Sequence, residues 1–432
     1  MANVLIVSGS YFPHATANAV CAKEFENILK RKGHKVYYAI RSHDIDTPRI
    51  TEQDGVQIYH IEESVGEFYG TCEKLKKVSM PQPLRGMFRT ALLLIRLIMH
   101  LYSGLFFGTQ RKFAEKSYLK EYAKTIKYIV EEKNIDVIIS VSMPFLSHKA
   151  VLAYLGKCKK EKRPKWIAYM IDAYSQKVGA DNVNEKIKDE MIVLNKADKT
   201  ILLSVLQSGY NKAPFDKYKE KMEYMLLPLF NLDETNKELP QSAIAKDGFV
   251  DCVFAGTLYD ETSPLAFFCD FVRAINDSKI RFHFLGKIYP NNLNMLKKLQ
   301  DETNSEIVIY GFMPYDFAQQ AIKEADVVIN IGNSSIYQIP SKIFQYMSLI
   351  KPILTFYRIK DDTALPYLEK YPMAFNIFEE SGSLEPEQLE EAKQFIFGKH
   401  DSKVSRNDLK EIYKGYTSDD VCEEFYKIFL SL

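Results

Sequence analysis

The chain has 432 residues, of which 46% are hydrophobic and 13% aromatic. At roughly 100–200 residues per domain, this length predicts two or three domains with substantial cores and excludes a disordered or fibrous chain. The net charge is +1, without the basic excess typical of nucleic-acid-binding proteins, so nucleic acid is not an expected partner. Residues 1–200 hold 32 Lys and Arg against 22 Asp and Glu, whereas the remainder holds 25 against 34. A basic N-terminal half therefore precedes an acidic C-terminal half.

The six cysteines are scattered without C-x-x-C or Cys/His spacing, so they indicate neither a zinc site nor a disulfide framework. We expect reduced thiols and no bound metal. The opening run, Met1–Val7, is only as long as a strand and has no basic region before it, which is not the pattern of a signal peptide. These features together indicate a cytoplasmic protein.

The first forty residues follow the pattern of a strand, a helix and a second parallel strand. An unbroken apolar run at Val4–Ser8 is typical of a strand buried on both faces. The following helix ends with the basic run Lys30–Lys32 and Gly33, and Val36–Ile40 then resumes a strand. Such a unit joins two strands of a parallel sheet by a right-handed crossover.

Similar units recur through the chain in two sets. The first set continues at 136–141, 166–171 and 200–203, and the second comprises 250–256, 281–286, 306–311, 325–330 and 351–356. A polar, proline-containing stretch around Leu227–Gly248 separates them. We therefore predict an α/β protein with two doubly wound Rossmann-like domains, at 1–230 and 231–432, whose last helix, 418–430, packs on either domain.

A basic, apolar insertion at about 74–116 interrupts the first domain. Its apolar run from Thr90 to Phe107 is long enough to span a bilayer, but Arg96 and His100 lie in its middle. Its polar residues share one helical face, which favours an amphipathic helix that does not span the membrane. Three packing surfaces remain open for such a helix: the domain's own core, an anionic membrane surface, or a partner helix. The surrounding Lys and Arg residues favour the anionic membrane surface.

Four motifs lie where the predicted strands end or a helix begins. They are Tyr11–Val20 with Arg31–Val36, Ser142–His148 followed by Trp166–Asp172, Ala255–Tyr259, and Ile339–Pro352. Over nearly the whole chain these segments resemble GT-B fold glycosyltransferases of the group-1 type, which is retaining and family 4-like and serves bacterial polysaccharide biosynthesis. The last motif is the most specific.

The resemblance implies GT-B architecture, in which the two domains face an interdomain cleft. It implies that domain 1–230 binds the acceptor, a glycan or a lipid-linked sugar, and that domain 231–432 binds a nucleoside-diphosphate sugar. The sugar nucleotide is then a substrate, and neither a cofactor nor a metal is expected.

Lys342 is the main catalytic candidate. Pro340 and Ser341 precede it at a helix start, where free N–H groups and a lysine suit a diphosphate. Negative charge develops on the departing phosphate during glycosyl transfer, so a cation held there is catalytic as well as adhesive. The alternative is a routine helix start with a solvated lysine.

Other donor-binding candidates come from the resemblance. Gln345 falls where the family usually has a glutamate that contacts the ribose hydroxyls, and its amide oxygen can still accept those hydrogen bonds. The paired glutamate of the family falls at Tyr337, so the pair is absent. Phe312 lies in a turn where the resemblance implies contact with the nucleobase through the backbone, with core packing as the alternative.

The diphosphate loop of the family corresponds here to Gly256, Thr257 and Tyr259. The family often places an arginine and a lysine in this loop, whereas residues 260–264 of this chain supply neither. Lys287, which follows a later strand, is a substitute cation or else an ordinary surface lysine.

Candidates in the N-terminal domain lie in three loops. Alanines replace a glycine pair of the family in the first loop, which also carries His14 and Asn18. His148 and Asp172 follow later strands and are further catalytic candidates if they point into the cleft. In that position His148 would form a hydrogen bond to the donor sugar or to the acceptor hydroxyl, and Asp172 would orient the acceptor. The alternative for His148 is a packing role inside the domain, and the alternative for Asp172 is to cap the following turn.

The sequence therefore favours a hexosyltransferase that uses a nucleoside-diphosphate sugar for surface polysaccharide synthesis at the inner face of the cell membrane. The missing glutamates and loop cations leave a second hypothesis, a non-catalytic relative that binds a nucleotide or acts as an assembly partner. A sugar-nucleotide epimerase on the same fold is a third.

Overall fold

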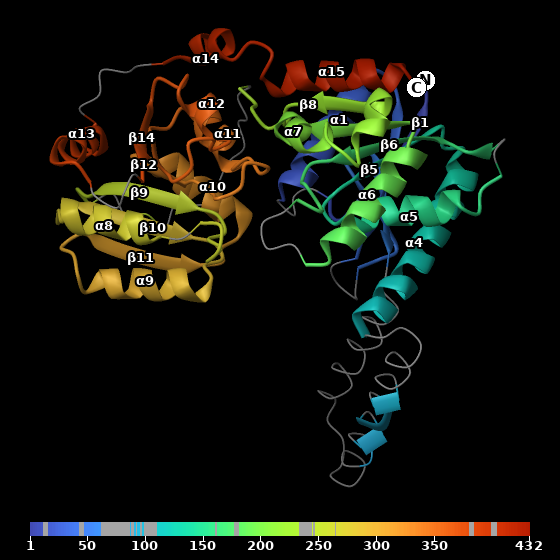
Figure 1. Ribbon diagram of the computed structural model, residues 1–432, viewed down its shortest axis with the longest axis horizontal. Coiled ribbons are helices and arrows are strands. Elements are labelled where there is room, and N and C mark those ends of the chain that lie inside the picture. Colours follow the sequence, from blue (N-terminus) through green and yellow to red (C-terminus); the bar gives the residue numbers. More distant parts are fainter. Residues whose placement is uncertain are drawn as a thin grey trace.

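The structure is a computed structural model (Figure 1). It describes residues 1–11, 16–42, 47–61, 87, 90–91, 93–95, 97–98, 110–159, 162–176, 181–232, 244, 247–263, 265–379, 384–398 and 404–432. His14 and most of the insertion at 74–116 lie outside the described residues.

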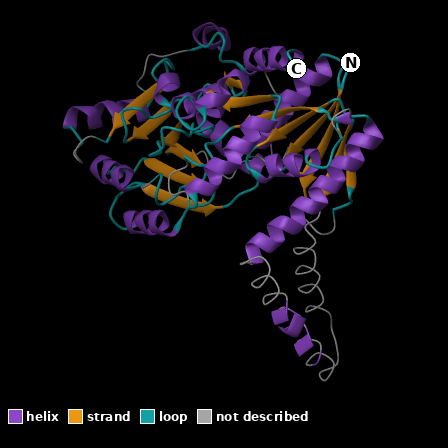
Figure 2. Cartoon of the chain, turned by 45° about the vertical axis from the view of Figure 1, so that its right-hand side comes forward, coloured by secondary structure: helices purple, strands orange, loops and turns teal. Residues whose placement is uncertain are grey.

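The N-terminal domain is built on an eight-stranded sheet covered by helices on both faces (Figures 1 and 2). Its strands are β1 (Asn3–Ser8), β2 (Lys35–Arg41), β3 (Ile50–Gln53), β4 (Val56–Ile61), β5 (Val137–Val141), β6 (Lys165–Met170), β7 (Lys199–Leu203) and β8 (Met222–Met225). Its longer helices are α1 (Ala17–Arg31), α4 (Gln110–Lys133), α5 (Leu146–Leu155) and α6 (Val183–Lys196), and its short ones are α7 (Gln207–Tyr210) and the 3₁₀ turns η2 (Ser204–Leu206) and η3 (Asp216–Lys221). The strand order is β3-β4-β2-β1-β5-β6-β7-β8, and only the edge strand β3 runs antiparallel to its neighbour.

The C-terminal domain is built on a six-stranded parallel sheet with the order β11-β10-β9-β12-β13-β14. Its strands are β9 (Val250–Ala255), β10 (Ile280–Leu285), β11 (Glu306–Gly311), β12 (Val327–Ile331), β13 (Ile353–Tyr357) and β14 (Ala374–Phe378). Its helices are α8 (Ala266–Ile275), α9 (Pro290–Gln300), α10 (Tyr315–Glu324), α11 (Lys342–Ser348), α12 (Leu365–Leu368), α13 (Pro386–Ile396) and α14 (Arg406–Ile412). From β9 the chain adds β10 and β11 on one side of this strand, and then crosses over to add β12, β13 and β14 on its other side. This strand order is that of a doubly wound α/β domain.

The last helix, α15 (Ser418–Leu430), returns to the N-terminal domain and packs along α1 (Figure 1). The rings of Phe25 and Phe425 stack with their centroids 3.9 Å apart, and Arg31 forms an ion pair with Asp419 at 2.9 Å. Just before this helix, the Tyr413 hydroxyl donates to a backbone carbonyl of the C-terminal domain. The chain therefore crosses between the domains twice, and of the two positions that the sequence left open for this helix, the structure shows the return to the N-terminal domain.

The described residues between β4 and α4, here called the projecting segment, lie away from both domains, beyond the N-terminal end of α4 (Figures 1 and 2). The apolar side chains described there are solvent-exposed to between 40% and 73%; they are Met87, Leu93, Leu94, Ile95, Leu97 and Ile98. Their residues are helical, as the sequence predicts for this run. Among the described helices, none has both the length and the hydrophobicity needed to cross a membrane.

Candidate active site

A cavity of about 550 Å³ opens at the carboxyl ends of β9, β10, β11 and β12. These ends point toward the N-terminal domain (Figure 1). The cavity spans the pair β9 and β12, where the strand order reverses, and open α/β sheets bind their ligands at this point. Its described lining comes from the C-terminal domain, between Phe254 and Tyr346.

Two glycines bring the loops at one side of the cavity into direct contact. A Cβ atom on Gly286 would lie 1.9 Å from the carbonyl oxygen of Gly256, and Gly286 has a φ of +120°, so no other residue fits there. The backbone N–H of Gly256 donates to Leu285, and that of Gly286 donates to Gly311. These bonds join the loops after β9, β10 and β11 into one surface.

Two lysines give the cavity its charge. Lys287 and Lys342 line it, and none of the described lining residues is Asp or Glu. Lys342 is the first residue of α11, and burial lowers the pKa of its ammonium group. Its nearest hydrogen-bond partner is neutral, the Gln345 amide oxygen at 3.2 Å. An anionic ligand would therefore supply the counter-charge that this part of the cavity lacks.

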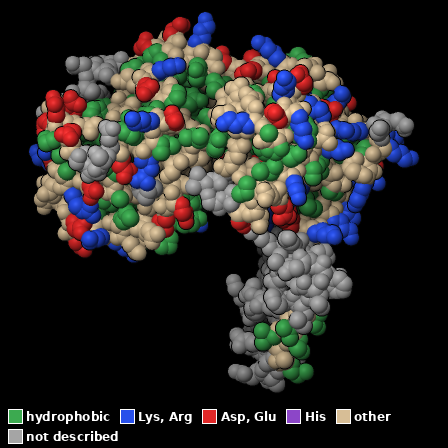
Figure 3. All heavy atoms as spheres, viewed as in Figure 1, with side chains coloured by type: hydrophobic (Ala, Val, Ile, Leu, Met, Phe, Trp, Pro, Cys, Tyr) green, Lys and Arg blue, Asp and Glu red, His purple; other side chains and the backbone are tan. Residues whose placement is uncertain are grey.

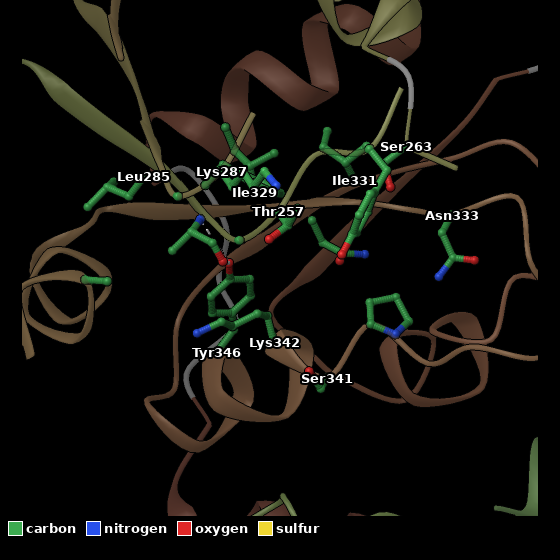
Figure 4. A pocket seen from close by; sticks show the side chains of 18 of the residues that line it. Thr257, Ser263, Leu285, Lys287, Ile329, Ile331, Asn333, Ser341, Lys342 and Tyr346 are labelled. Carbon is green, nitrogen blue, oxygen red and sulfur yellow. Dashed lines mark hydrogen bonds between the residues drawn. The ribbon is translucent and has the colours of Figure 1, made fainter. Parts of the chain in front are cut away.

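Helix α11 has only seven residues, so its dipole adds little to anion binding and the charge of Lys342 carries the effect. Figure 4 shows Lys342 and Tyr346 on this helix and Ser341 just before it, below Thr257 and Ile329. The sequence predicted an anion site from the helix start and the lysine together; in the structure the lysine is the stronger feature.

Uncharged polar side chains also line the cavity. Thr257, Ser263, Asn333 and Ser341 lie around it (Figure 4). The loop before α11 is held in place because the side chains of Asn333 and Thr363 both donate to the carbonyl oxygen of Gln338. Hydroxyl and amide groups on a braced loop suit the hydroxyls of a sugar.

Aromatic rings stand at the rim of the cavity. Phe312 is 87% exposed and Tyr259 is 40% exposed, although both line the cavity. The ring of Tyr259 lies 5.0 Å from that of Tyr289, over which the Lys287 ammonium group sits at 4.6 Å. Since Phe312 is exposed, core packing does not explain it, and a planar ligand group can stack on it.

Seven of the residues singled out from the sequence thus lie together in this lining; they are Gly256, Thr257, Tyr259, Lys287, Phe312, Ser341 and Lys342. Gln345 is not among the lining residues. Its side chain lies between Lys342 and α10: the amide oxygen accepts a hydrogen bond from Lys342, and the amide nitrogen donates one to Gln319 of α10.

The candidates of the N-terminal domain that the structure describes do not line this cavity. His148 is fully buried, contrary to the expectation that it points into the cleft. Its Nδ1 lies 2.7 Å from the Ser140 hydroxyl oxygen, which also accepts a hydrogen bond from the indole of Trp166. Burial lowers the pKa of His148 to about 3, so it is neutral at physiological pH. The packing role, which the sequence left open, fits this position.

Asn18 and Asp172 lie near the carboxyl ends of the N-terminal sheet. Asn18 donates from Nδ2 to the carbonyl oxygen of Met143 at 3.0 Å, which ties the start of α1 to the loop after β5. Asp172 is partly exposed, two residues after the end of β6. Neither side chain lines the cavity, and His14 lies outside the described residues.

The polar residues of the lining that sequence reasoning did not identify include Thr262, Ser263, Asn330, Asn333 and Gln338. The sequence could have pointed to Asn330, because it is a polar residue near the carboxyl end of an apolar strand. Ligands are expected at such positions when the strand lies at the strand-order reversal. Ser263 and Gln338 come from loops whose paths the sequence does not predict.

No family model and no curated protein sequence matches the chain. Solved structures do resemble it over its whole length. A sucrose-phosphate synthase from Thermosynechococcus elongatus has a TM-score of 0.64 at 10% identity, covering 100% of this chain and 99% of that one. The catalytic domain of starch synthase IV from Arabidopsis thaliana, bound to ADP and acarbose, has a TM-score of 0.62 at 10% identity, with 100% and 99% covered.

A UDP-GlcNAc 2-epimerase from Methanocaldococcus jannaschii is also similar, with a TM-score of 0.52 at 12% identity and 100% of both chains covered. Likeness at such low identity establishes architecture, and one architecture hosts more than one activity. The sequence-based expectation of fold is confirmed: this chain has the GT-B fold, with two Rossmann-like domains and a C-terminal helix that returns to the first.

Proposed function

We propose that the protein is a glycosyltransferase that moves a sugar from a nucleoside-diphosphate sugar to a glycan or lipid-linked acceptor. One observation carries the proposal: the cavity at the strand-order reversal contains two lysines, and no carboxylate among its described lining residues. A diphosphate neutralises these charges, the exposed ring of Phe312 stacks the base, and Thr257, Ser263 and Asn333 suit the sugar. The bound ADP named for the starch synthase structure is consistent with this reading.

Lys342 would act on the leaving group. In the transfer step, the acceptor oxygen forms a bond to the anomeric carbon while the bond from that carbon to the phosphate oxygen breaks. The electron pair of the broken bond stays on the phosphate, where an ammonium group stabilises the developing charge. With retention of configuration, the phosphate oxygen takes the proton of the acceptor hydroxyl, so no separate general base is required. Because Lys342 supplies the positive charge, we expect no metal requirement.

The acceptor would bind to the N-terminal domain. This domain faces the carboxyl ends of the C-terminal strands, and its half of the chain carries the excess of Lys and Arg. A positive surface attracts an acceptor that carries phosphate, such as a lipid-linked sugar in surface polysaccharide synthesis.

The projecting segment supports a location at the inner face of the cell membrane. Its described apolar side chains are exposed and lie away from both domains, and Figure 3 shows Lys and Arg side chains, together with some Asp and Glu, on the face of the N-terminal domain that is turned toward them. Apolar groups next to basic groups bind to anionic bilayers through two additive effects, hydrophobic burial and charge attraction.

One observation favours a second function, a non-catalytic nucleotide-binding protein. The amide of Gln345 is engaged by Lys342 and Gln319 inside the protein, whereas a free carboxylate at this position would be available to a ribose. An epimerase on this fold would differ from both, because it would release nucleoside diphosphate without any acceptor.

The decisive experiment is thermal unfolding of the purified protein with a panel of nucleoside diphosphates and their sugars. A ligand present at about 100 times its dissociation constant adds about 2.7 kcal/mol to the free energy of unfolding. We expect one nucleotide family to stabilise the wild type and to have little effect on Lys342→Ala. Lys298→Ala is the matched control, since Lys298 is 73% exposed on α9 and does not line the cavity.

Transfer is then measured with the stabilising donor and with membrane or glycan acceptors. Sugar transfer with retained configuration supports the full proposal, and release of the nucleotide without an acceptor indicates an epimerase. Binding without turnover by any acceptor favours the non-catalytic function. If no nucleotide stabilises the wild type, the proposed donor site is wrong.

A further inference from the structure

Asn330 is a polar residue in an otherwise apolar strand. It is the fourth residue of β12, and its neighbours Val327, Val328 and Ile329 are fully buried core residues. Asparagine is depleted in strands, so a position of this kind usually has a specific reason.

The side chain of Asn330 is buried, lines the cavity and lacks a partner. It is only 4% exposed, and its Nδ2 atom has no hydrogen-bond partner in the described part of the chain. A buried donor without a partner destabilises the folded protein, and native structures contain few of them. A ligand oxygen that reaches this nitrogen would remove the cost.

Asn330 belongs to a row of three polar residues on one face of the sheet. It pairs in register with Thr355 of β13, which pairs with Asn376 of β14. Thr355 Oγ1 and Asn376 Oδ1 also have no partner among the described residues. Only Asn330 of these three lines the cavity, so Thr355 serves as an internal comparison: it is also buried with an unpaired polar atom, but it is not among the lining residues.

The charge of the cavity indicates what Asn330 would meet there. Lys287 and Lys342 favour an oxygen-rich anion, which offers acceptors and no donors. An amide nitrogen supplies two N–H donors and no charge. Resting on the proposed function, we infer that Asn330 is a further donor-binding residue, whose Nδ2 donates to a diphosphate or sugar oxygen of the bound nucleotide sugar.

Two substitutions test this inference. Asn330→Leu removes the amide at similar volume, and Asn330→Asp keeps the shape but replaces the donors by a negatively charged acceptor. We expect both variants to raise the dissociation constant for the stabilising nucleotide sugar at least tenfold. The melting temperature of the ligand-free Asn330→Leu protein should stay equal to that of the wild type or rise, because the variant buries no unpaired donor.

Thr355→Val is the matched control, as it removes an unpaired polar atom from the same row at equal volume. It should leave the dissociation constant within twofold of the wild-type value. If instead Thr355→Val weakens binding as much as Asn330→Leu, the two side chains bond to each other and the inference is wrong.

The ligand used separates the two oxygen sources. A tenfold loss that already appears with the nucleoside diphosphate alone assigns the contact to phosphate, and a loss seen only with the nucleotide sugar assigns it to a sugar oxygen. Unchanged binding by Asn330→Leu or Asn330→Asp overturns the inference while leaving the proposed function intact. A wild type that binds no nucleotide overturns the proposed function and removes the basis of the inference with it.

Discussion

The ammonium group of Lys342 donates a hydrogen bond of 3.2 Å to the amide oxygen of Gln345, one turn further along α11. On its other side, Gln345 donates to Gln319 of α10. A neutral amide thus stands next to a partly buried cation, where a carboxylate would form an ion pair.

Gln345→Glu should weaken the binding of nucleoside diphosphates. A carboxylate next to the Lys342 ammonium group forms an ion pair with it and so supplies the counter-charge that the ligand would otherwise supply. We expect the dissociation constant for the stabilising nucleoside diphosphate to rise about tenfold, equivalent to about 1.4 kcal/mol. Titration calorimetry measures this constant. Gln319→Glu is the control, because its carboxylate lies on the far side of Gln345 from Lys342; an equal loss there would contradict this prediction.

The pH dependence of nucleotide binding should report on Lys342. Burial lowers its pKa from the ordinary value, and an anion binds to the protonated form. Affinity should therefore fall as the pH rises through this lowered pKa, below about 10.5, the ordinary value for lysine. Lys342→Arg stays charged over this range, so its affinity for the nucleotide should not fall with pH. Titration calorimetry between neutral and alkaline pH measures the affinity of both proteins. A fall in Lys342→Arg equal to that of the wild type would contradict this prediction.

The same shift affects stability in the absence of ligand. The unfolded chain holds more protons on Lys342 than the folded chain between the lowered pKa and the ordinary one, so this group makes the folded state more stable as the pH rises through that interval. Bound anion reverses the effect by favouring the charged form.

Phe425→Ala should destabilise the N-terminal domain from the far end of the chain. The fully buried ring of Phe425 stacks on that of Phe25 between α15 and α1. Truncating a buried phenylalanine costs about 3–5 kcal/mol. Urea unfolding followed by circular dichroism measures the loss, and Leu430→Ala, at a position that is 65% exposed on the same helix, should change stability by less than about 0.5 kcal/mol. Equal effects of the two substitutions would show that α15 is not docked as described.

Replacing Leu93, Leu94 and Leu97 together by serine should reduce binding to vesicles that contain anionic phospholipid. These side chains are 65%, 55% and 53% exposed, so the melting temperature should not change. Cosedimentation with vesicles measures binding, and higher salt should weaken the charge-dependent part. Ile192→Ser on α6, also exposed, is the control. Full binding by the triple variant would exclude this segment as the membrane contact.

The sequence by itself determined the architecture. Apolar runs such as Val4–Val7 and Trp166–Met170 mark strands buried on both faces, and the helices between such strands require parallel sheets. These signals are local, because they depend on residues a few positions apart. The sequence also singled out Lys342 and the loop at Gly256, since a motif at a strand end or a helix start keeps its place in the fold.

Only the tertiary structure decided which side chains meet. Lys342 and Gly256 are far apart in the chain and line one cavity, whereas His148, which the sequence placed near the cleft, bonds to Ser140 inside the N-terminal core. The burial of Lys342 and the unpaired amide of Asn330 depend on groups brought together from different strands and loops. Hydrogen bonding and solvent exposure are properties of that packing, and no run of neighbouring residues encodes them.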